Sequence, residues 1–361
     1  MTQEISKRIY VCHTFYHVYI SFLKELALPL EERGNADIVL SRLSTDFKNA
    51  GERIVSTGIF QNAYDYDEKR ETFFPELNYW RKNRGNIVAN SLARIIFTKK
   101  YSKLQEPFIP VDFKKYKDIY VYCDNDPIGW YLSGHRIYYH AVEDGLNYLK
   151  PFVPAVYDNR GAFKFKVFLS DKLNLLFIRD GFNKYCLDME VNDISVIEYP
   201  CKKYKEVPRQ ALFDRLTKED KEILLKAFVD NLDALKATIA SMDKDKESIL
   251  VLTEPLTTDL NQRAKIFRDI IDEYSKYGTC FLKPHPRDEL DYPTVFSDVP
   301  QFASIVPMEM LNFFDNLHFN KVVGVFTQLD SISFADEKIT LGKDFMDKYE
   351  DPEKHRWYEK K

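Results

Sequence analysis

Short apolar runs alternate along the chain with segments in which apolar residues recur every three or four positions. The runs of strand length are Ile9–Cys12, Ala36–Leu40, Asp118–Cys123, Arg136–Val142, Ile249–Thr253, Tyr277–Leu282 and Val322–Phe326. Helical spacing follows the first run at Tyr16, Ile20, Leu23 and Leu26, and it fills Asn261–Tyr277. Strand and helix patterns that alternate in this way predict β-α-β units with parallel sheets. The expected fold class is therefore α/β.

A polar, charged stretch that ends in proline, Cys201–Pro208, separates two groups of these patterns. A chain of 361 residues is also long enough for two domains. We therefore expect an N-terminal domain over residues 1–200, a linker over 201–208, a C-terminal domain over 209–340 and a charged tail over 341–361.

Composition excludes several classes of protein. A formal net charge of −4 argues against a general nucleic-acid binder. The five cysteines are odd in number and unclustered, which is typical of reduced thiols and gives no CxxC metal site. The start of the sequence has no apolar signal region, and no apolar run reaches membrane-spanning length. These features predict a cytoplasmic protein.

Residues 77–104 contain seven lysines and arginines and no acidic residue. Val88, Leu92, Ile95 and Ile96 recur there at helical spacing. One interpretation is a solvated cationic face that covers the core. The other is a basic amphipathic helix in peripheral contact with the inner face of the cell membrane, or with a lipid-linked substrate.

The most informative histidine is His285, which lies between two prolines just after the Tyr277–Leu282 run. Prolines on both sides keep the backbone extended, so this histidine is expected beyond the carboxyl end of a strand, where open α/β sheets bind ligands. Lys283 and Arg287 add positive charge, and the group suits an anion such as a phosphate. Taken alone, His285 is equally consistent with a surface turn.

An acidic pair, Glu143 and Asp144, follows the Arg136–Val142 run and precedes Gly145. A carboxylate released by a glycine at a strand end points into the ligand crevice. One of two adjacent carboxylates in a cleft can have its pKa raised, which suits a general base. The alternative is an acidic turn that caps a following helix over Leu146–Leu149.

Four other polar residues lie near predicted helix starts. Thr14 and His17 begin the first helix, where they either meet a ligand or serve as an N-cap and a packed histidine. Glu309 is either a first-turn charge or an acceptor for a ribose diol. Thr327 follows a strand and either caps a helix or joins backbone N–H groups in an anion nest.

In this order the fragments resemble the bacterial sialyltransferases of the GT-B architecture, most closely glycosyltransferase family 52, which acts on lipooligosaccharide and capsule. The matching elements are VCHTFYH at Val11–His17, EDG at Glu143–Gly145, LTEPL at Leu252–Leu256, KPHP at Lys283–Pro286, PMEML at Pro307–Leu311 and the hydroxyl of Thr327. The ordered set is more specific than any one member. The resemblance implies two Rossmann-like doubly wound domains facing a central cleft, with the acceptor on the N-terminal side and a CMP-activated sugar on the C-terminal side.

The resemblance also implies residue roles. Asp144, in one motif with Glu143, takes the proton from the acceptor hydroxyl, and His285 donates to the departing phosphate of CMP. The residues expected at the nucleotide are Lys283, Pro286, Glu309, Thr327, Thr253 and Pro255, and those expected at the acceptor are Thr14 and His17. The implied reaction is an inverting transfer of sialic acid, or a related nonulosonic acid, from CMP-sialic acid to a hydroxyl of a bacterial surface glycan. No cofactor and no metal are expected, because protein cations and hydroxyls can neutralise the phosphate and no convincing Asp-x-Asp metal motif is present.

The sequence departs from the family pattern at two positions. Gln328 stands where the family often has a second serine, and Glu254 stands where a neutral glutamine is expected. Either change is consistent with a different donor, such as another nonulosonic acid or Kdo, or with weakened activity. Two alternative functions stay open: a polyol-phosphate transferase of the teichoic-acid type, and a catalytically silent GT-B protein that binds nucleotide.

Overall fold

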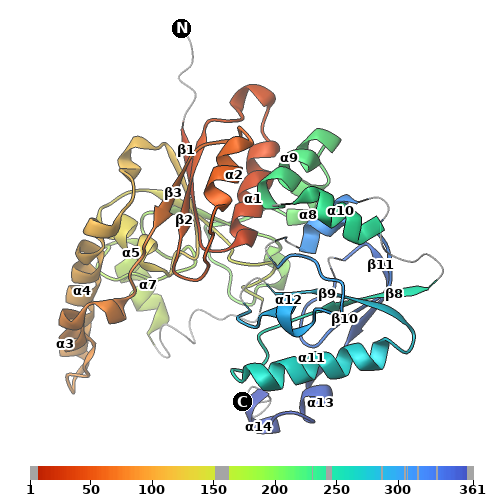
Figure 1. Cartoon of the computed structure of the whole chain (residues 1–361). Coiled ribbons are helices and arrows are strands. Elements are labelled where there is room, and N and C mark those ends of the chain that lie inside the picture. Colours follow the sequence, from red (N-terminus) through yellow and green to blue (C-terminus); the bar gives the residue numbers. More distant parts are fainter. Residues whose placement is uncertain are drawn as a thin grey trace. The chain divides into compact units, whose positions relative to one another are not determined.

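The computed structural model describes residues 7–150, 162–229, 231–240, 246–285, 288–304, 306, 308–314, 317–330 and 332–355 (Figure 1). The chain divides into two compact units, Met1–Leu224 (unit 1) and Leu225–Lys361 (unit 2). Both are built on parallel sheets, which confirms the α/β prediction.

Unit 1 contains a seven-stranded parallel sheet in the order β3-β2-β1-β4-β5-β6-β7. The strands are β1 (Arg8–Cys12), β2 (Ala36–Ser41), β3 (Phe60–Tyr66), β4 (Asp118–Tyr122), β5 (Tyr139–Val142), β6 (Cys186–Val191) and β7 (Tyr204–Glu206). The helices are α1 (Phe15–Leu26), α2 (Ala50–Ser56), α3 (Asn78–Arg81), α4 (Ile87–Leu104), α5 (Pro127–Gly134), α7 (Phe163–Asp171), α8 (Arg209–Phe213) and α9 (Lys218–Phe228), the last crossing the division between units. Short 3-10 turns cover Leu30–Glu32, Glu71–Phe73, Pro75–Leu77, Glu106–Phe108, Phe113–Lys115 and Ile194–Val196.

The strand order of unit 1 reverses between β1 and β4, which both lie at the centre of the sheet. All five residues of β1 are buried, as expected for a central strand covered on both faces. Such a reversal is the topological switch point at which doubly wound sheets bind ligands. The carboxyl ends of β1 and β4 are therefore the expected ligand site of unit 1.

A buried ion pair fixes α1 against β1. Arg8 donates from Nε and Nη2 to the two carboxylate oxygens of Glu25, at 2.7 and 2.8 Å, and the Tyr10 hydroxyl donates to the same carboxylate at 2.7 Å. A buried pair of this kind is stable when its geometry is bidentate and its remaining lone pairs are satisfied. The pair therefore sets the position of the polar residues that α1 carries.

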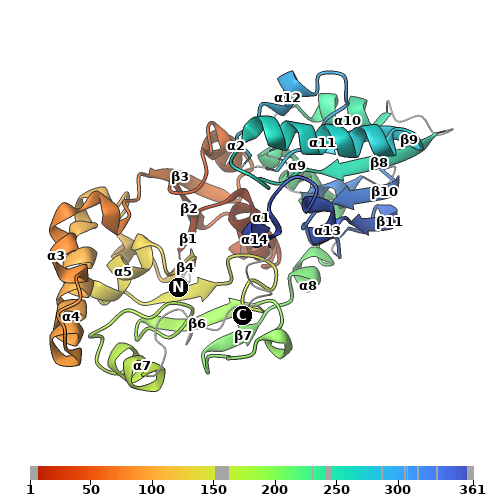
Figure 2. The same cartoon turned by 90° about the horizontal axis from the view of Figure 1, so that it is seen from below.

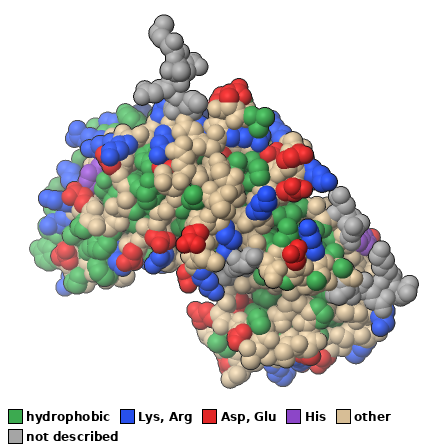
Figure 3. Space-filling view, turned by 45° about the horizontal axis from the view of Figure 1, so that its top comes forward, with side chains coloured by type: hydrophobic (Ala, Val, Ile, Leu, Met, Phe, Trp, Pro, Cys, Tyr) green, Lys and Arg blue, Asp and Glu red, His purple; other side chains and the backbone are tan. Residues whose placement is uncertain are grey.

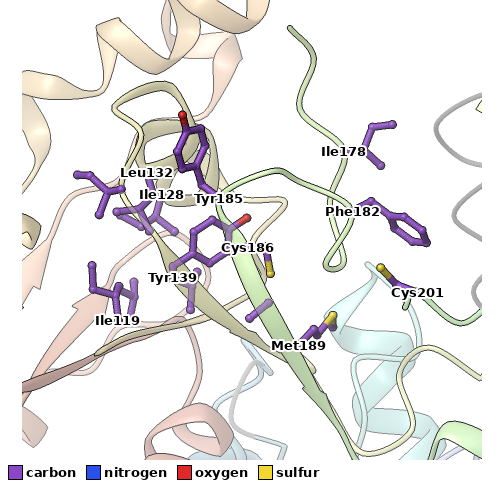
Figure 4. Packing of buried hydrophobic residues seen from close by; sticks show 14 of the residues in the cluster. Ile119, Ile128, Leu132, Tyr139, Ile178, Phe182, Tyr185, Cys186, Met189 and Cys201 are labelled. Carbon is purple, nitrogen blue, oxygen red and sulfur yellow. The ribbon is translucent and has the colours of Figure 1, made fainter. Parts of the chain in front are cut away.

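The main core of unit 1 lies under α5. Side chains from β4, α5, β5 and β6 pack together there, including Ile119, Ile128, Leu132 and Tyr139 (Figure 4). Because these side chains have almost no exposure to solvent, replacing one of them with a smaller side chain costs folding stability. The N-terminus of α5, which borders the candidate site, is consequently held by a packed core.

Unit 2 contains a four-stranded parallel sheet in the order β11-β10-β8-β9. The strands are β8 (Glu247–Leu252), β9 (Gly278–Lys283), β10 (Phe319–Gly324) and β11 (Ala335–Thr340). The helices are α10 (Leu232–Ala240), α11 (Leu260–Tyr274), α12 (Tyr292–Val295), α13 (Gly342–Met346), α14 (Pro352–His355) and the 3-10 helix Met308–Phe313. Asp259 caps α11 by accepting from two backbone N–H groups, and the apolar face of α11 packs against β8 and β9 (Figure 1). The order again reverses, here between β8 and β10.

Two boundaries differ from the sequence prediction. Residues 201–208 are not a linker, because Tyr204–Glu206 form β7, which pairs in parallel with β6. The segment has a buried tyrosine followed by an exposed lysine and glutamate, and charges of this kind suit the edge of a sheet. The residues from 341 onward are not a separate tail either, because Met346 of α13 is fully buried in the core under α11.

Candidate active site

The polar residues of unit 1 gather where β1, β4 and β5 end, on either side of the switch point. His13, Thr14 and His17 follow β1, Cys123 and Asp126 follow β4, and Glu143 and Asp144 follow β5. Parallel strands bring their carboxyl ends to one edge of the sheet. The acidic pair and the start of the first helix are thus brought together at one edge of the sheet.

The centre of this site is a hydrogen bond between Asp144 and His17. The Nε2 atom of His17 lies 2.7 Å from Oδ1 of Asp144 and 2.9 Å from its backbone carbonyl oxygen. The other ring nitrogen of His17, Nδ1, accepts the backbone N–H of His13 at 3.0 Å. Since Nδ1 is an acceptor, the hydrogen of the neutral ring is on Nε2 and is donated to Asp144.

His17 is held as a neutral ring. Its side chain is fully buried and stacks on Tyr122 with centroids 4.4 Å apart. Burial lowers the pKa of His17, and this outweighs the opposing effect of Asp144. Asp144, whose side chain is 32% exposed, is therefore oriented by a neutral donor and stays partly accessible to a ligand.

Cys123 supplies a second donor to the same carboxylate. Its Sγ atom lies 2.8 Å from Oδ1 of Asp144. Burial and the nearby Asp144 raise the pKa of the thiol well above its usual value, so it stays protonated and acts as a donor rather than a nucleophile. Cys123 also has a φ of 52°, a conformation that non-glycine residues adopt mainly where surrounding structure imposes it.

Glu143 has a different environment from Asp144. It is 2% exposed, and its two oxygens accept the backbone N–H groups of Leu149 at 3.1 Å and Asn192 at 2.8 Å. It thus ties the turn after β5 to the end of β6. Residues 146–150 form turns rather than a helix, so the acidic pair does not cap one. Of the two carboxylates, Asp144 is therefore the one that a ligand can reach.

A second cluster of titratable side chains, formed by His13, Glu68 and Asp126, adjoins the Asp144–His17 pair. The Nε2 atom of His13 lies 2.7 Å from Glu68 and 3.6 Å from Asp126, and all three side chains are largely buried. Burial alone would lower the pKa of His13, but the two carboxylates raise it overall. Burial raises the pKa of Asp126 to about 6, although His13 opposes the shift. No sequence signal assigns a role to Glu68 or Asp126, and His13 is included only as a member of the VCHTFYH motif.

Replacing Asp126 by asparagine is expected to stabilise the fold at neutral pH by roughly 3 kcal/mol, since each unit of pKa shift corresponds to about 1.4 kcal/mol. The carboxyl ionises near pH 3.8 when unfolded and near pH 6 when folded, so unfolding between these values releases a proton and stability falls as the pH rises. The advantage of the variant should therefore grow from about pH 4 to about pH 6 and then stay constant. Urea unfolding at pH 4, 6 and 7.5 measures this, and destabilisation at pH 7.5 would contradict it.

His13, His17 and Cys123 place possible metal-ligand atoms within 4.8 Å of one another. The hydrogen bonds argue against a metal among them. Nδ1 of His17 already accepts a backbone N–H, so Nε2 carries a hydrogen and offers no lone pair. This donor set does not fit a metal ion, and metal independence stays a prediction.

The Lys283–His285 segment of unit 2 is fixed to the end of β8. The Thr253 hydroxyl accepts the backbone N–H of His285 at 3.0 Å, and the Thr253 N–H donates to the Lys283 carbonyl at 3.2 Å. Lys283 is 5% exposed, and its ammonium donates to the carbonyls of Pro284 and Ser304 at 3.0 and 3.2 Å. Lys283 therefore supports the loop that carries His285, through contacts with backbone carbonyl groups.

Glu254 and Thr327 meet at the switch point of unit 2. The Glu254 carboxylate accepts the backbone N–H groups of Val325, Phe326 and Thr327, each at 2.9 Å from Oε1. The predicted nest of N–H groups is thus present, and a carboxylate of the chain lies in it. No local pattern indicates this contact, because the partners are more than 70 residues apart.

The other predicted residues are placed as follows. Thr14 is the N-cap of α1, because its hydroxyl accepts the His17 N–H at 3.3 Å. Pro255 is exposed in the loop after β8. Glu309 belongs to the 3-10 helix Met308–Phe313, and its side chain is outside the described part of the structure, as is Pro286.

Two Rossmann-like units, each built on a doubly wound parallel sheet, are the architecture of the GT-B glycosyltransferases. The fold is similar to that of the α/β-galactoside α-2,3-sialyltransferase of Photobacterium phosphoreum, with 13% identity, a TM-score of 0.54 and coverage of 93% of this chain and 91% of that one. A sialyltransferase from Photobacterium damsela gives 12% identity and a TM-score of 0.49, with 92% and 73% covered. Residues 57–343 match glycosyltransferase family 52, and the chain belongs to that family.

One relative found by sequence is an uncharacterised protein of Haemophilus influenzae. It is 30% identical over 97 residues, which are 26% of this chain and 31% of that protein. The match thus spans about a third of the relative's length.

Proposed function

We propose that this protein is an inverting sialyltransferase that moves sialic acid, or a related nonulosonic acid, from a CMP-activated donor to a hydroxyl of a bacterial surface glycan. The observation that carries the proposal is the Asp144–His17 pair at the switch point of unit 1. Membership of glycosyltransferase family 52 and the fold shared with the Photobacterium phosphoreum sialyltransferase support the choice of sugar.

The proposed chemistry is a single displacement. The acceptor hydroxyl loses its proton to Asp144 as its oxygen bonds to the anomeric carbon of the donor sugar. The bond from that carbon to the phosphate oxygen breaks, and its electron pair leaves with CMP. The transition state resembles an oxocarbenium ion, so charge on the leaving phosphate must be stabilised. We assign that task to His285 and Thr327.

The test incubates the protein with a panel of activated donors and with glycans that can accept sialic acid, and it measures the release of the nucleotide. We expect acceptor-dependent release of CMP from CMP-sialic acid. Turnover of CMP-Kdo alone would change the sugar and keep the mechanism. Transfer from CDP-glycerol would replace the proposal with a polyol-phosphate transferase, and absence of turnover with every donor would favour a silent nucleotide-binding protein.

We also propose peripheral membrane contact through the surface formed by α3 and α4, residues 78–104. Ile87, Val88 and Leu92 are 77%, 66% and 57% exposed, and α4 lies beside α5 at the edge of unit 1 (Figure 2). Basic and hydrophobic side chains lie close together along the left-hand edge of Figure 3, where Figure 1 places these helices. A groove of about 460 Å³ adjoins them, lined by Trp80, Arg81, Lys82, Asn83, Asn90, Ala93, Arg94, Phe97 and Trp130. Among the described residues, no helix has the length and apolar character needed to cross a bilayer.

This contact predicts binding to vesicles that contain anionic lipid and little binding to neutral ones. Changing Lys99 and Lys100 to glutamate should lower the affinity at least tenfold, because each lysine near such a surface contributes about 1 kcal/mol. Changing the exposed pair Lys114 and Lys115 in the same way is the matched control. Cosedimentation at low and high salt measures the effect, and equal losses in both variants would contradict a specific surface.

A further inference from the structure

The nest after β10 is an anion site whose donors belong to the backbone. The N–H groups of Val325, Phe326 and Thr327 all point at the Glu254 carboxylate, and Phe326 also donates to Oε2 at 3.2 Å. Successive backbone N–H groups in this arrangement bind anions whatever side chains they carry. Hydrogen bonds to an ionised acceptor are also among the stronger ones in proteins.

The nest lies where the fold offers a ligand site. It follows β10, and Glu254 follows β8, the two strands between which the order of unit 2 reverses. Ligands of doubly wound sheets bind at the carboxyl ends of the strands on either side of such a reversal. Thr253, next to Glu254, holds the backbone of His285. A carboxylate of the chain therefore lies at the position expected for a ligand's negative group.

We infer that the Glu254 carboxylate and the phosphate of the donor compete for this nest, so that Glu254 sets the affinity for the donor and for the CMP product. The inference rests on the proposed function and deepens it. Before the donor binds, the carboxylate satisfies the three N–H groups. Donor phosphate displaces it, and after transfer the carboxylate returns and favours the departure of CMP.

The isosteric neutral variant Glu254→Gln distinguishes two roles of Glu254. In one, its carboxylate competes with phosphate for the nest; in the other, it only supports the loop after β10. The amide oxygen of the glutamine can still accept N–H groups, but without the charge that strengthens the contact. We expect inorganic phosphate and CMP each to bind about tenfold more tightly to the variant, the effect of one charge-assisted hydrogen bond. Glu247→Gln is the matched control, because Glu247 starts β8, at the end of the strand opposite to Glu254, and pairs with Lys321.

Isothermal titration of the full chain with phosphate, and separately with CMP, measures these affinities. Unchanged or weaker binding of both ligands to Glu254→Gln would overturn the inference and make Glu254 a fixed support of the loop. If the variant does not fold, the native protein still gives an answer by NMR. Saturating phosphate should shift the amide signals of Val325, Phe326 and Thr327, and the absence of a shift would overturn the inference.

Failure of this inference can be told apart from failure of the proposed function. If the wild type releases CMP from an activated sugar but the variant gains no affinity, the function stands and the competition does not. If no activated sugar reacts, the function falls, and phosphate binding to the nest still decides the role of Glu254.

Discussion

Replacing Asp144 by asparagine is expected to lower the rate of sugar transfer by roughly a thousandfold, within the range for loss of a general base. The asparagine carbonyl oxygen can still accept the Nε2 hydrogen of His17, so the turn after β5 should keep its position. The amide cannot take the proton of the acceptor hydroxyl. Transfer rates at saturating donor measure the loss, and titration with CMP should show unchanged nucleotide affinity.

Glu143→Gln is the informative companion to this variant. Both carboxylate oxygens of Glu143 accept backbone N–H groups, so the glutamine leaves one of those groups without an acceptor. The expected cost is about 1–2 kcal/mol of folding stability, with transfer activity within a few fold of the wild type. Loss of transfer in a folded Glu143→Gln variant, together with activity in Asp144→Asn, would move the base to Glu143.

Local sequence was enough to place the strand ends and thus the candidate residues that follow them. The apolar run before Glu143 and Asp144 and the prolines beside His285 are local signals, and the parallel sheets confirm the expected fold class. The difference between Glu143 and Asp144 could not be predicted in this way. It depends on the N–H of Asn192, which β6 brings from 49 residues away.

The contacts that sequence analysis missed have no local signal of their own. His13 meets Glu68 across 55 residues, and each is an ordinary polar residue within its own segment. The linker prediction failed for a related reason. An exposed edge strand such as β7 needs few apolar residues, so its charges are indistinguishable from those of a loop until its pairing with β6 is known.

Each unit has a reversal of strand order in its sheet, and the two reversals collect different kinds of polar group. The reversal in unit 1 collects a carboxylate together with neutral donors, which suits proton removal. The reversal in unit 2 collects backbone N–H groups and the extended segment of His285, which suits a negative leaving group. A proton acceptor and an anion site are the two elements that the proposed displacement of CMP by a hydroxyl requires.

Replacing His285 by alanine is expected to lower the transfer rate by roughly a hundredfold to a thousandfold, the usual loss when one donor to developing charge is removed. The backbone N–H of residue 285 would still donate to the Thr253 hydroxyl, because that bond does not involve the imidazole, so the fold should persist. His318→Ala is the matched control, since His318 is exposed in the same unit and pairs with Asp336 at 2.9 Å. Single-turnover rates of CMP release measure both variants. A loss of donor affinity at an unchanged rate of the chemical step would show that His285 binds the donor equally in the ground state and the transition state, because only groups that bind the transition state more tightly accelerate the reaction.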